Sequence, residues 1–212
     1  MKIKKVLALI MAVTATACIH ANETYGFAAA SIPMQTLKVD DMDTTVESAG
    51  AAINGGVIWI FDSKLYTKVD ASIGAVFSND FGTRDSYDLG THCIVAGGVG
   101  YSLISGEKLD FTVGGLIGLD FFEYEMDYHT VEPFVQYELK DSSLCFITGL
   151  DTMLLLHLGE EFGLYANLKI YANIGGLNEK LEPRYYSSHA SDEWYKTMGM
   201  TIMPSVGLTM KL

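Results

Sequence analysis

Histidines and carboxylates are the residues of this chain that could carry acid–base chemistry. A hydrolytic or acyl-transfer site needs a nucleophile, a base and an orienting carboxylate within hydrogen-bond reach. His92 has Asp88 four residues before it, whereas His129 and His189 fall in long polar stretches and His157 precedes a short turn. None of these histidines has the spacing from serine and acidic residues that indicates such a site. The sequence also contains no metal-binding or phosphate-binding motif, so it predicts neither a cofactor nor a metal.

Charged residues form a second set, because they alternate with other residues along apolar segments. The set consists of Lys68, Asp70, Lys108, Asp110, Asp120, Asp151, Lys169 and Lys211. If these side chains face an enclosed interior, they must pair, since an isolated buried charge is costly. The pattern therefore predicts a network of salt bridges that fills the interior and closes it to ions.

The segments that carry these charges have the two-residue period of β-strands. In FGLYANLKIYANIGG, residues 162–176, an apolar set from Phe162 to Ile174 interleaves with a polar set from Gly163 to Gly175. Such alternation indicates a strand with one apolar and one polar face. Similar segments occur at about 23–33, 48–61, 65–77, 87–104, 108–124, 143–157, 162–176 and 194–212. The sequence therefore predicts eight strands, with Tyr25, Phe27 and Ala29 on the apolar side of the first.

The predicted connections alternate between short and long. Three are tight turns, at 62–64, 105–108 and 159–161, and four are long polar segments, at 35–48, 78–87, 125–142 and 178–196. This asymmetry is typical of outer-membrane barrels. Residues 130–139 also alternate, but a ninth spanning strand would break the even-number rule. We predict that they extend a hairpin beyond the membrane, with a bulge near Asp141–Ser143.

Composition and the N-terminal segment restrict the class further. Of the 212 residues, 49% are hydrophobic and 19% charged, and the net charge is −12, which argues against disorder and against nucleic-acid binding. Three lysines precede an apolar stretch that ends in small residues, the pattern of a secretory signal peptide. We predict a signal peptide over 1–21 and one mature domain over 22–212. Lipidation of Cys18 is a less favoured alternative.

Two cysteines remain after the predicted cleavage site. Cys93 falls on the apolar face of its strand and Cys145 on the polar face of another strand that is not its neighbour. A disulfide needs the two Cα atoms within roughly 7 Å and converging side chains. We therefore predict that no disulfide forms.

Two features indicate that the apolar face contacts lipid and is not the inner face of a soluble, lipocalin-like barrel. The first is a set of aromatic residues near the ends of the apolar faces, as in the girdles at membrane interfaces. They are Tyr25, Phe27, Trp59, Phe61, Phe77, Tyr101, Phe121, Phe162 and Trp194. The second is the C-terminal SVGLTMKL, whose Ser205, Gly207, Met210 and Leu212 match the signal that outer-membrane barrels present to their assembly machinery, with leucine where a terminal aromatic is usual.

The chain thus resembles the small eight-stranded bacterial outer-membrane barrels of the OmpA, OmpX and OmpW kind. The resemblance implies an all-β, antiparallel transmembrane barrel in the bacterial outer membrane, in contact with lipid and with the barrel-assembly machinery. It favours a structural role, or binding of a host or surface ligand by the long loops, rather than catalysis.

Two prolines suggest an alternative function. Pro33 and Pro204 interrupt the first and last strands, which pair with each other in a closed barrel. Close together, they would produce either a pair of harmless bulges or a lateral opening for small hydrophobic molecules, as in OmpW-like barrels. A lipid-modifying barrel enzyme is the third alternative.

Overall fold

The computed structural model describes residues 21–39, 44–79, 88–129, 136–183 and 191–212. Within these ranges the chain is all-β, and no helix there is long and apolar enough to span a membrane. The strands are β1 (Glu23–Ser31), β2 (Met34–Val39), β3 (Thr44–Ile60), β4 (Leu65–Asn79), β5 (Asp88–Ser105), β6 (Leu109–His129), β7 (Gln136–His157), β8 (Phe162–Pro183) and β9 (Ser191–Lys211).

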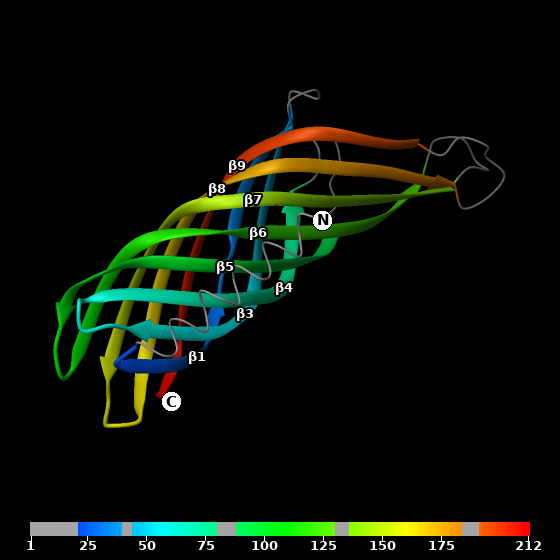
Figure 1. The fold of residues 1–212 in the computed structure, drawn as a ribbon. Coiled ribbons are helices and arrows are strands. Elements are labelled where there is room, and N and C mark those ends of the chain that lie inside the picture. Colours follow the sequence, from blue (N-terminus) through cyan, green and yellow to red (C-terminus); the bar gives the residue numbers. More distant parts are fainter. Residues whose placement is uncertain (1–20, 40–43, 80–87, 130–135, 184–190) are drawn as a thin grey trace.

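The strands form one closed antiparallel barrel (Figure 1). Strands β1 and β2 both pair with β3 on one side and with β9 on the other, so together they fill a single position. The barrel therefore has eight strand positions, as predicted. The predicted long loop over 35–48 is wrong in part, because 34–39 and 44–48 are paired strand residues. Their polar composition concealed an alternation in which Gln35, Leu37 and Val39 are buried.

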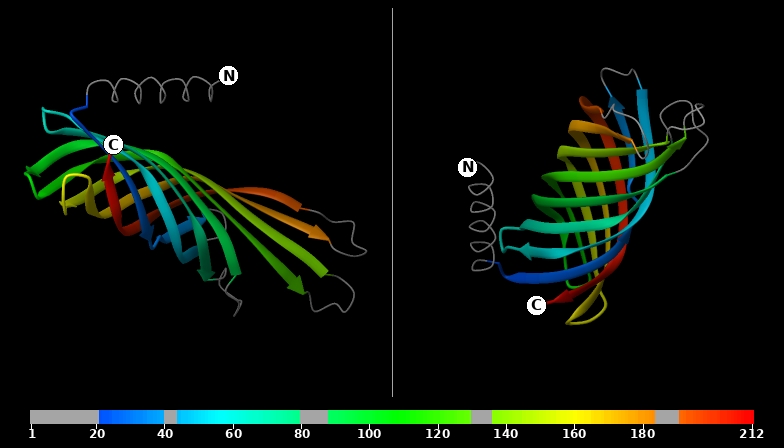
Figure 2. Two further views of the ribbon diagram at one scale, coloured as in Figure 1. Left: turned by 90° about the horizontal axis from the view of Figure 1, so that it is seen from below. Right: turned by 90° about the vertical axis from the view of Figure 1, so that its right-hand side faces the viewer.

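Four strands continue well beyond the barrel on one side (Figures 1 and 2). Strands β6 to β9 contain 21 or 22 residues each, whereas about 9–11 suffice to cross a bilayer. Residues 136–139 belong to β7 and pair with 126–129 of β6, which confirms the predicted hairpin extension for that part. Residues 130–135 lie outside the described ranges. The bulge predicted near Asp141–Ser143 is wrong, because Tyr124 pairs with Asp141 and Phe122 with Ser143 without a register shift.

The apolar faces point outward over most of the barrel. Phe162 and Ile174 are 58% and 48% exposed, while Tyr165, Lys169 and Tyr171 between them are buried. An exposed apolar belt of this size is suited to lipid and not to water. Five of the predicted girdle aromatics lie in the exposed set, namely Phe77, Tyr101, Phe121, Phe162 and Trp194. Trp59 is buried instead.

The first strand has the opposite orientation to the one predicted. Tyr25, Phe27 and Ala29 are buried in the interior, and Phe27 stacks on Tyr165 with ring centroids 4.5 Å apart. The outward positions of β1 hold small residues such as Ala28 and Ala30. The side with larger apolar residues looked lipid-facing in the sequence, but the narrow interior needs that volume more than the outer surface does.

The three predicted tight turns are confirmed. The Phe61 N–H donates to the Leu65 carbonyl at 2.9 Å, and the Leu158 N–H donates to the Phe162 carbonyl at 3.0 Å. The first turn places Lys64 in the left-handed region, with φ of 62°. This conformation is costly for a residue with a Cβ.

Candidate functional site

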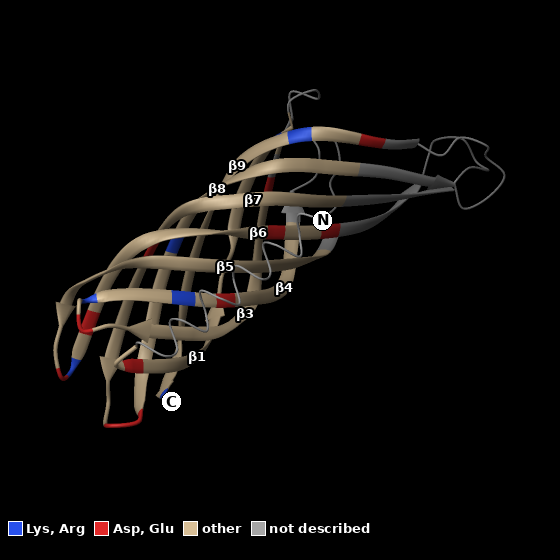
Figure 3. Ribbon diagram, viewed as in Figure 1, with Lys and Arg blue, Asp and Glu red and all other residues tan. Residues whose placement is uncertain are grey.

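A chain of four alternating charges crosses the middle of the barrel interior. Lys169 Nζ lies 2.6 Å from Asp70 Oδ1, and Lys68 Nζ lies 3.5 Å from Asp70 Oδ2 and 2.7 Å from Asp151 Oδ2. The four side chains are at most 2% exposed. Two cations and two anions make the chain neutral overall. Blue and red segments follow one another along β4 in Figure 3, where Lys68 and Asp70 are two residues apart and share a face.

Strand register and glycines bring these charges together. Asp151 and Lys169 face each other directly across β7 and β8. Across the barrel, β4 reaches Asp151 past glycines of β5 and β6. A Cβ on Gly98 would lie 3.3 Å from Asp151 Oδ2, and one on Gly114 would lie 2.6 Å from the Tyr66 hydroxyl. Because these wall positions have no side chain, Lys68 and Tyr66 can extend through the interior.

Asp151 receives further hydrogen bonds from neutral groups. Asn167 Nδ2 donates to Asp151 Oδ1 at 2.6 Å, and the Tyr66 hydroxyl donates to Asp151 Oδ2 at 3.3 Å. A buried carboxylate is tolerated when its acceptor sites are used in this way. The ion pairs and neutral donors therefore act as one polar layer.

The predicted set of interior charges is confirmed for six of its eight members: Lys68, Asp70, Asp110, Asp120, Asp151 and Lys169 are buried. The prediction is wrong for Lys108 and Lys211, which do not face the interior. Lys108 is exposed at a turn, and Lys211 is 41% exposed at the barrel rim, where it pairs with Glu23 at 2.6 Å. Both lie where the strands end, so the alternation no longer places them in an enclosed space.

Each histidine of the described interior pairs with an aspartate. His92 Nε2 lies 2.6 Å from Asp120 Oδ1, and Gln35 Nε2 donates to Asp120 Oδ2 at 3.1 Å. His157 Nε2 lies 2.7 Å from Asp110 Oδ2. The hydrogen bonds of the described residues bring no serine hydroxyl to either imidazole, and no group of three or more potential metal ligands occurs in that part of the chain.

The side chain of His129 and all of His189 lie outside the described residues. The two histidines whose side chains are described, His92 and His157, are therefore each paired with an aspartate.

Apolar layers alternate with the polar ones inside the barrel. Near the tight turns the layer includes Tyr25, Phe27, Ile58, Ile60, Tyr66, Met153, Leu155 and Tyr165. A middle layer is formed by Ile94, Ala96, Leu116, Ile147, Tyr171 and Met203. The layer toward the long extensions contains Leu37, Val39, Val76, Phe122 and Leu177. Sequence reasoning missed these clusters, although their members stand at the same alternate positions as the buried charges.

The barrel wall is interrupted where β1 ends and β2 begins. Ser31 pairs with Ser205, and Met34 pairs with Ile202, so the offset to β9 is the same before and after the break. No residue is therefore inserted, and the break is not a bulge. The register places Pro33 at the level of Met203, next to Pro204.

The two prolines each remove one hydrogen bond from the wall. The Ile32 N–H donates to the Pro204 carbonyl at 3.1 Å, and the Gly50 N–H donates to the Pro33 carbonyl at 2.9 Å. The return bonds cannot form, because proline has no N–H. The carbonyl oxygens of Ile32 and Gly50 consequently lie opposite Pro204 and Pro33, whose nitrogens cannot donate a hydrogen bond.

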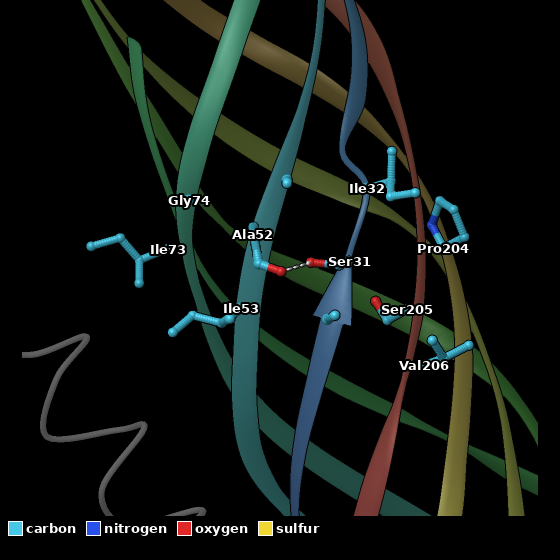
Figure 4. A pocket seen from close by; sticks show the side chains of 11 residues that line it. Ser31, Ile32, Ala52, Ile53, Ile73, Gly74, Pro204, Ser205 and Val206 are labelled. Atoms are coloured by element: carbon cyan, nitrogen blue, oxygen red, sulfur yellow. Dashed lines mark hydrogen bonds between the residues drawn. The ribbon is translucent and has the colours of Figure 1, made fainter. Parts of the chain in front are cut away.

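A pocket of about 620 Å³ lies in the wall at this break (Figure 4). Its outward-facing lining consists of Ala30, Ile32, Ala51, Ile53, Ile73 and Val206 together with Pro204. Ser31 and Ser205 also line it. The Ser31 hydroxyl donates to the Ala52 carbonyl at 3.2 Å, whereas the buried Ser205 hydroxyl has no hydrogen-bond partner among the described residues.

The four residues that match the assembly signal divide between the two faces of β9. Ser205 is buried, whereas Met210 and Leu212 are 45% and 67% exposed. Gly207 lies on the same face as Ser205, opposite Ala29. Recognition of these residues by the assembly machinery stays a prediction.

The predicted absence of a disulfide is confirmed. Cys145 is a free, buried thiol, and Cys93 is a free thiol of intermediate exposure. The two cysteines lie on β5 and β7, which are separated by β6.

A closed eight-position barrel with an apolar outer belt and a polar, ion-paired interior defines the class of small outer-membrane β-barrels. No protein-family model and no curated protein matches the chain. Similar solved structures include Neisserial surface protein A, with 10% identity, a TM-score of 0.50, and coverage of 88% of this chain and 97% of that one.

Two further barrels are similar over most of their length. The outer membrane protein OprG from Pseudomonas aeruginosa has 12% identity and a TM-score of 0.52, with coverage of 91% of this chain and 97% of that one. A major outer membrane protein from Thermus thermophilus has 10% identity and a TM-score of 0.55, with coverage of 87% of this chain and 99% of that one. The predicted resemblance, fold class and outer-membrane setting are therefore confirmed at the level of the fold.

Proposed function

We propose that the protein is a non-conducting, non-catalytic outer-membrane barrel that presents the extended ends of β6–β9 for binding at the cell surface. The long extension of these four strands is the observation that carries the proposal. Strands of about ten residues would suffice for a purely transmembrane role. Binding functions are commonly placed on exposed segments that a rigid scaffold holds in position.

The filled interior supports the non-conducting part of the proposal. The neutral chain of Lys169, Asp70, Lys68 and Asp151 lies among apolar layers, and an eight-stranded barrel leaves little further space. Planar-bilayer recording of the folded protein tests this directly, with a porin in the same bilayer as the positive control. We expect no steady conductance, and discrete openings of the wild-type protein would overturn the proposal.

Shortening the extension tests the binding role. Glu179 faces Glu193 in the β8–β9 register, so an Asn-Gly turn can replace residues 180–192 and leave the barrel intact. Cells that display the wild-type protein are expected to bind host cells or matrix, and this variant to lose that binding.

A second variant shortens the other half of the extension, the β6–β7 hairpin, between Glu125 and Lys140. Both variants must retain the mobility shift between unboiled and boiled samples that reports a folded barrel. Unchanged adhesion in both shortened variants would refute a binding role for the extension.

Passage of small hydrophobic molecules through the wall is a second candidate function. It is supported by the two hydrogen bonds that Pro33 and Pro204 remove and by the adjoining pocket. Hydrogen exchange at the amides of Ile32 and Gly50 tests local opening of this wall. Exchange as slow there as in the β7–β8 wall would argue against a lateral passage.

A further inference from the structure

We infer that the barrel interior holds a site for bound water molecules beside the chain of four charges, formed by Asn54, Tyr165, Asn167 and Ser205. These four side chains are called the water site below. The site lies on the inner face of the wall, and it depends neither on binding by the extension nor on passage through the wall.

Two facing side chains of β8 and β9 contribute the first unpaired oxygens. Asn167 and Ser205 lie directly opposite each other in the register and are 5% and 3% exposed. Asn167 Nδ2 donates to Asp151 Oδ1 at 2.6 Å, but Asn167 Oδ1 and the Ser205 hydroxyl have no hydrogen-bond partner among the described residues. Since the Cβ atoms of opposite residues are about 4.5–5.5 Å apart, one water can accept from the serine and donate to the amide oxygen.

Asn54 of β3 is buried with both ends of its side-chain amide unpaired. It is 4% exposed, and neither Nδ2 nor Oδ1 has a hydrogen-bond partner in the described part of the chain. Tyr165 of β8 lies in the same row of the register, and its hydroxyl is likewise buried without a partner there. Buried polar atoms without hydrogen bonds are costly, and buried water commonly supplies the missing bonds.

Small side chains leave room for water beside these groups. One row of the register runs from Tyr165 through Gly207, Ala29 and Asn54 to Ser72, and the next runs from Asn167 through Ser205, Ser31 and Ala52 to Gly74. Beyond β8, only Asn54 in these rows has more than two side-chain heavy atoms. A buried water needs the space of about one probe sphere and two to four polar partners, and the rows offer both.

Asp70 connects the water site to the chain of four charges. Its Oδ1 lies 2.6 Å from Lys169 Nζ, whereas its Oδ2 accepts no hydrogen bond from the described residues and lies 3.5 Å from Lys68 Nζ. Tyr165 is near enough to Asp70 to interact with it electrostatically. A water that accepts from the tyrosine and donates to Asp70 Oδ2 therefore completes the bonding of the buried carboxylate.

The charges of the interior favour water over a metal cation. Carboxylate, amide and hydroxyl oxygens are also the ligands of hard cations. The two lysines of the chain already neutralise the two aspartates, so an added cation would leave a net positive charge in a buried layer. Neutral water satisfies the same oxygens without this cost.

Apolar side chains confine the water site on two sides. Phe27 follows Ala29 along β1 in the apolar layer near the tight turns, and Met203 precedes Ser205 along β9 in the middle layer. Water held between these layers does not form a continuous path along the barrel axis. The site is therefore compatible with a barrel that does not conduct ions.

Hydroxyl-radical labelling by X-ray pulses detects such water in the wild-type protein. The radicals form from water itself, so a buried ring beside bound water is oxidised and a buried ring in a dry layer is not. Tyr165 and Phe122 are 1% and 2% exposed, and Phe122 lies in an apolar layer. We expect Tyr165 to be oxidised several-fold faster than Phe122, as measured by mass spectrometry after refolding into vesicles. Oxidation of Tyr165 no faster than that of Phe122 would overturn the inference.

Removing one hydroxyl group and adding another gives a second test. Ser205→Ala loses the bond to water and is expected to raise the equilibrium constant of unfolding about threefold to tenfold, whereas in a dry site it would leave the constant unchanged or lower it. Ala96→Ser, which places a hydroxyl in an apolar layer, is the matched control and is also expected to raise the constant. A general preference of strands for serine over alanine would change the two constants in opposite directions. Any result other than a rise in both would overturn the inference.

Exchange of the salt separates water from a cation. Sodium chloride is replaced by tetramethylammonium chloride at the same ionic strength, because tetramethylammonium is too large for a site of this kind. We expect the unfolding constant of the wild-type protein to stay the same. A higher constant in tetramethylammonium would assign the unpaired oxygens to a bound cation and would overturn the inference.

Discussion

The Lys68→Met substitution tests whether the buried charges act as one unit. Lys68 is the central cation, 2.7 Å from Asp151 and 3.5 Å from Asp70, and its side chain is 2% exposed. Methionine keeps most of the apolar stem but has no charge. The interior chain then changes from neutral to a net charge of −1, because two aspartates remain with only Lys169.

The expected cost follows from what is left around Asp151. Its side chain is fully buried, and after the substitution it keeps the donors Asn167 at 2.6 Å and Tyr66 at 3.3 Å. Removing one partner of a buried ion pair costs about 3–5 kcal/mol. Since two neutral donors remain, we expect the lower end, a loss of about 3 kcal/mol in the free energy of unfolding.

The assay is equilibrium urea unfolding of the refolded protein in vesicles, followed by tryptophan fluorescence. The double variant Lys68→Met with Asp151→Asn removes both charges, and we expect it to regain most of the lost stability, because replacing a buried pair with neutral groups is often nearly neutral.

Lys211→Met is the matched control. Its partner is Glu23, the two side chains are 41% and 38% exposed, and the expected cost is about 0–1 kcal/mol. The reasoning is refuted if Lys68→Met costs no more than this control, or if the double variant is as unstable as the single one.

Three further predictions concern the wall and the turns. Gly149→Val is expected to abolish the folded-barrel mobility shift, because a Cβ there would lie 2.1 Å from a carbonyl oxygen of β8. Gly159 has open space around it, so Gly159→Val should fold. Equal folding yields of the two variants would contradict this prediction. Lys64→Gly is expected to raise the free energy of unfolding by about 1 kcal/mol, because glycine adopts a φ of 62° without strain, and an unchanged urea midpoint would argue against it. A lipid-soluble maleimide is expected to modify Cys93 in the folded protein and Cys145 only after unfolding, as measured by mass spectrometry; modification of both thiols in the folded barrel would refute the assigned faces.

Local patterning predicted the repeating part of this molecule. Alternation from Phe162 to Ile174 identified a strand and its lipid-facing side, because successive side chains of a strand point in opposite directions whatever lies around them. The short turns after β3, β5 and β7 were predicted for a similar reason, since a hairpin is closed by residues that are adjacent in the chain.

Where alternation was weak, the sequence did not determine the direction of a face. Tyr25 and Phe27 looked lipid-facing because they are larger than their neighbours, yet they fill the interior against Tyr165. The segment at 34–39 was missed because its polar residues hide a regular alternation. In both cases the demand for volume and pairing comes from strands far away in the chain.

The sequence by itself thus determined an eight-position barrel, its lipid-facing belt and the need for interior charges to pair. Only the tertiary structure decided which charges pair, because Lys68 meets Asp151 through a register that spans three hairpins and past glycines that leave the space. The pocket at the seam is also a tertiary result. Its lining includes Ile32 and Pro204, which come together only when the last strand pairs with the first.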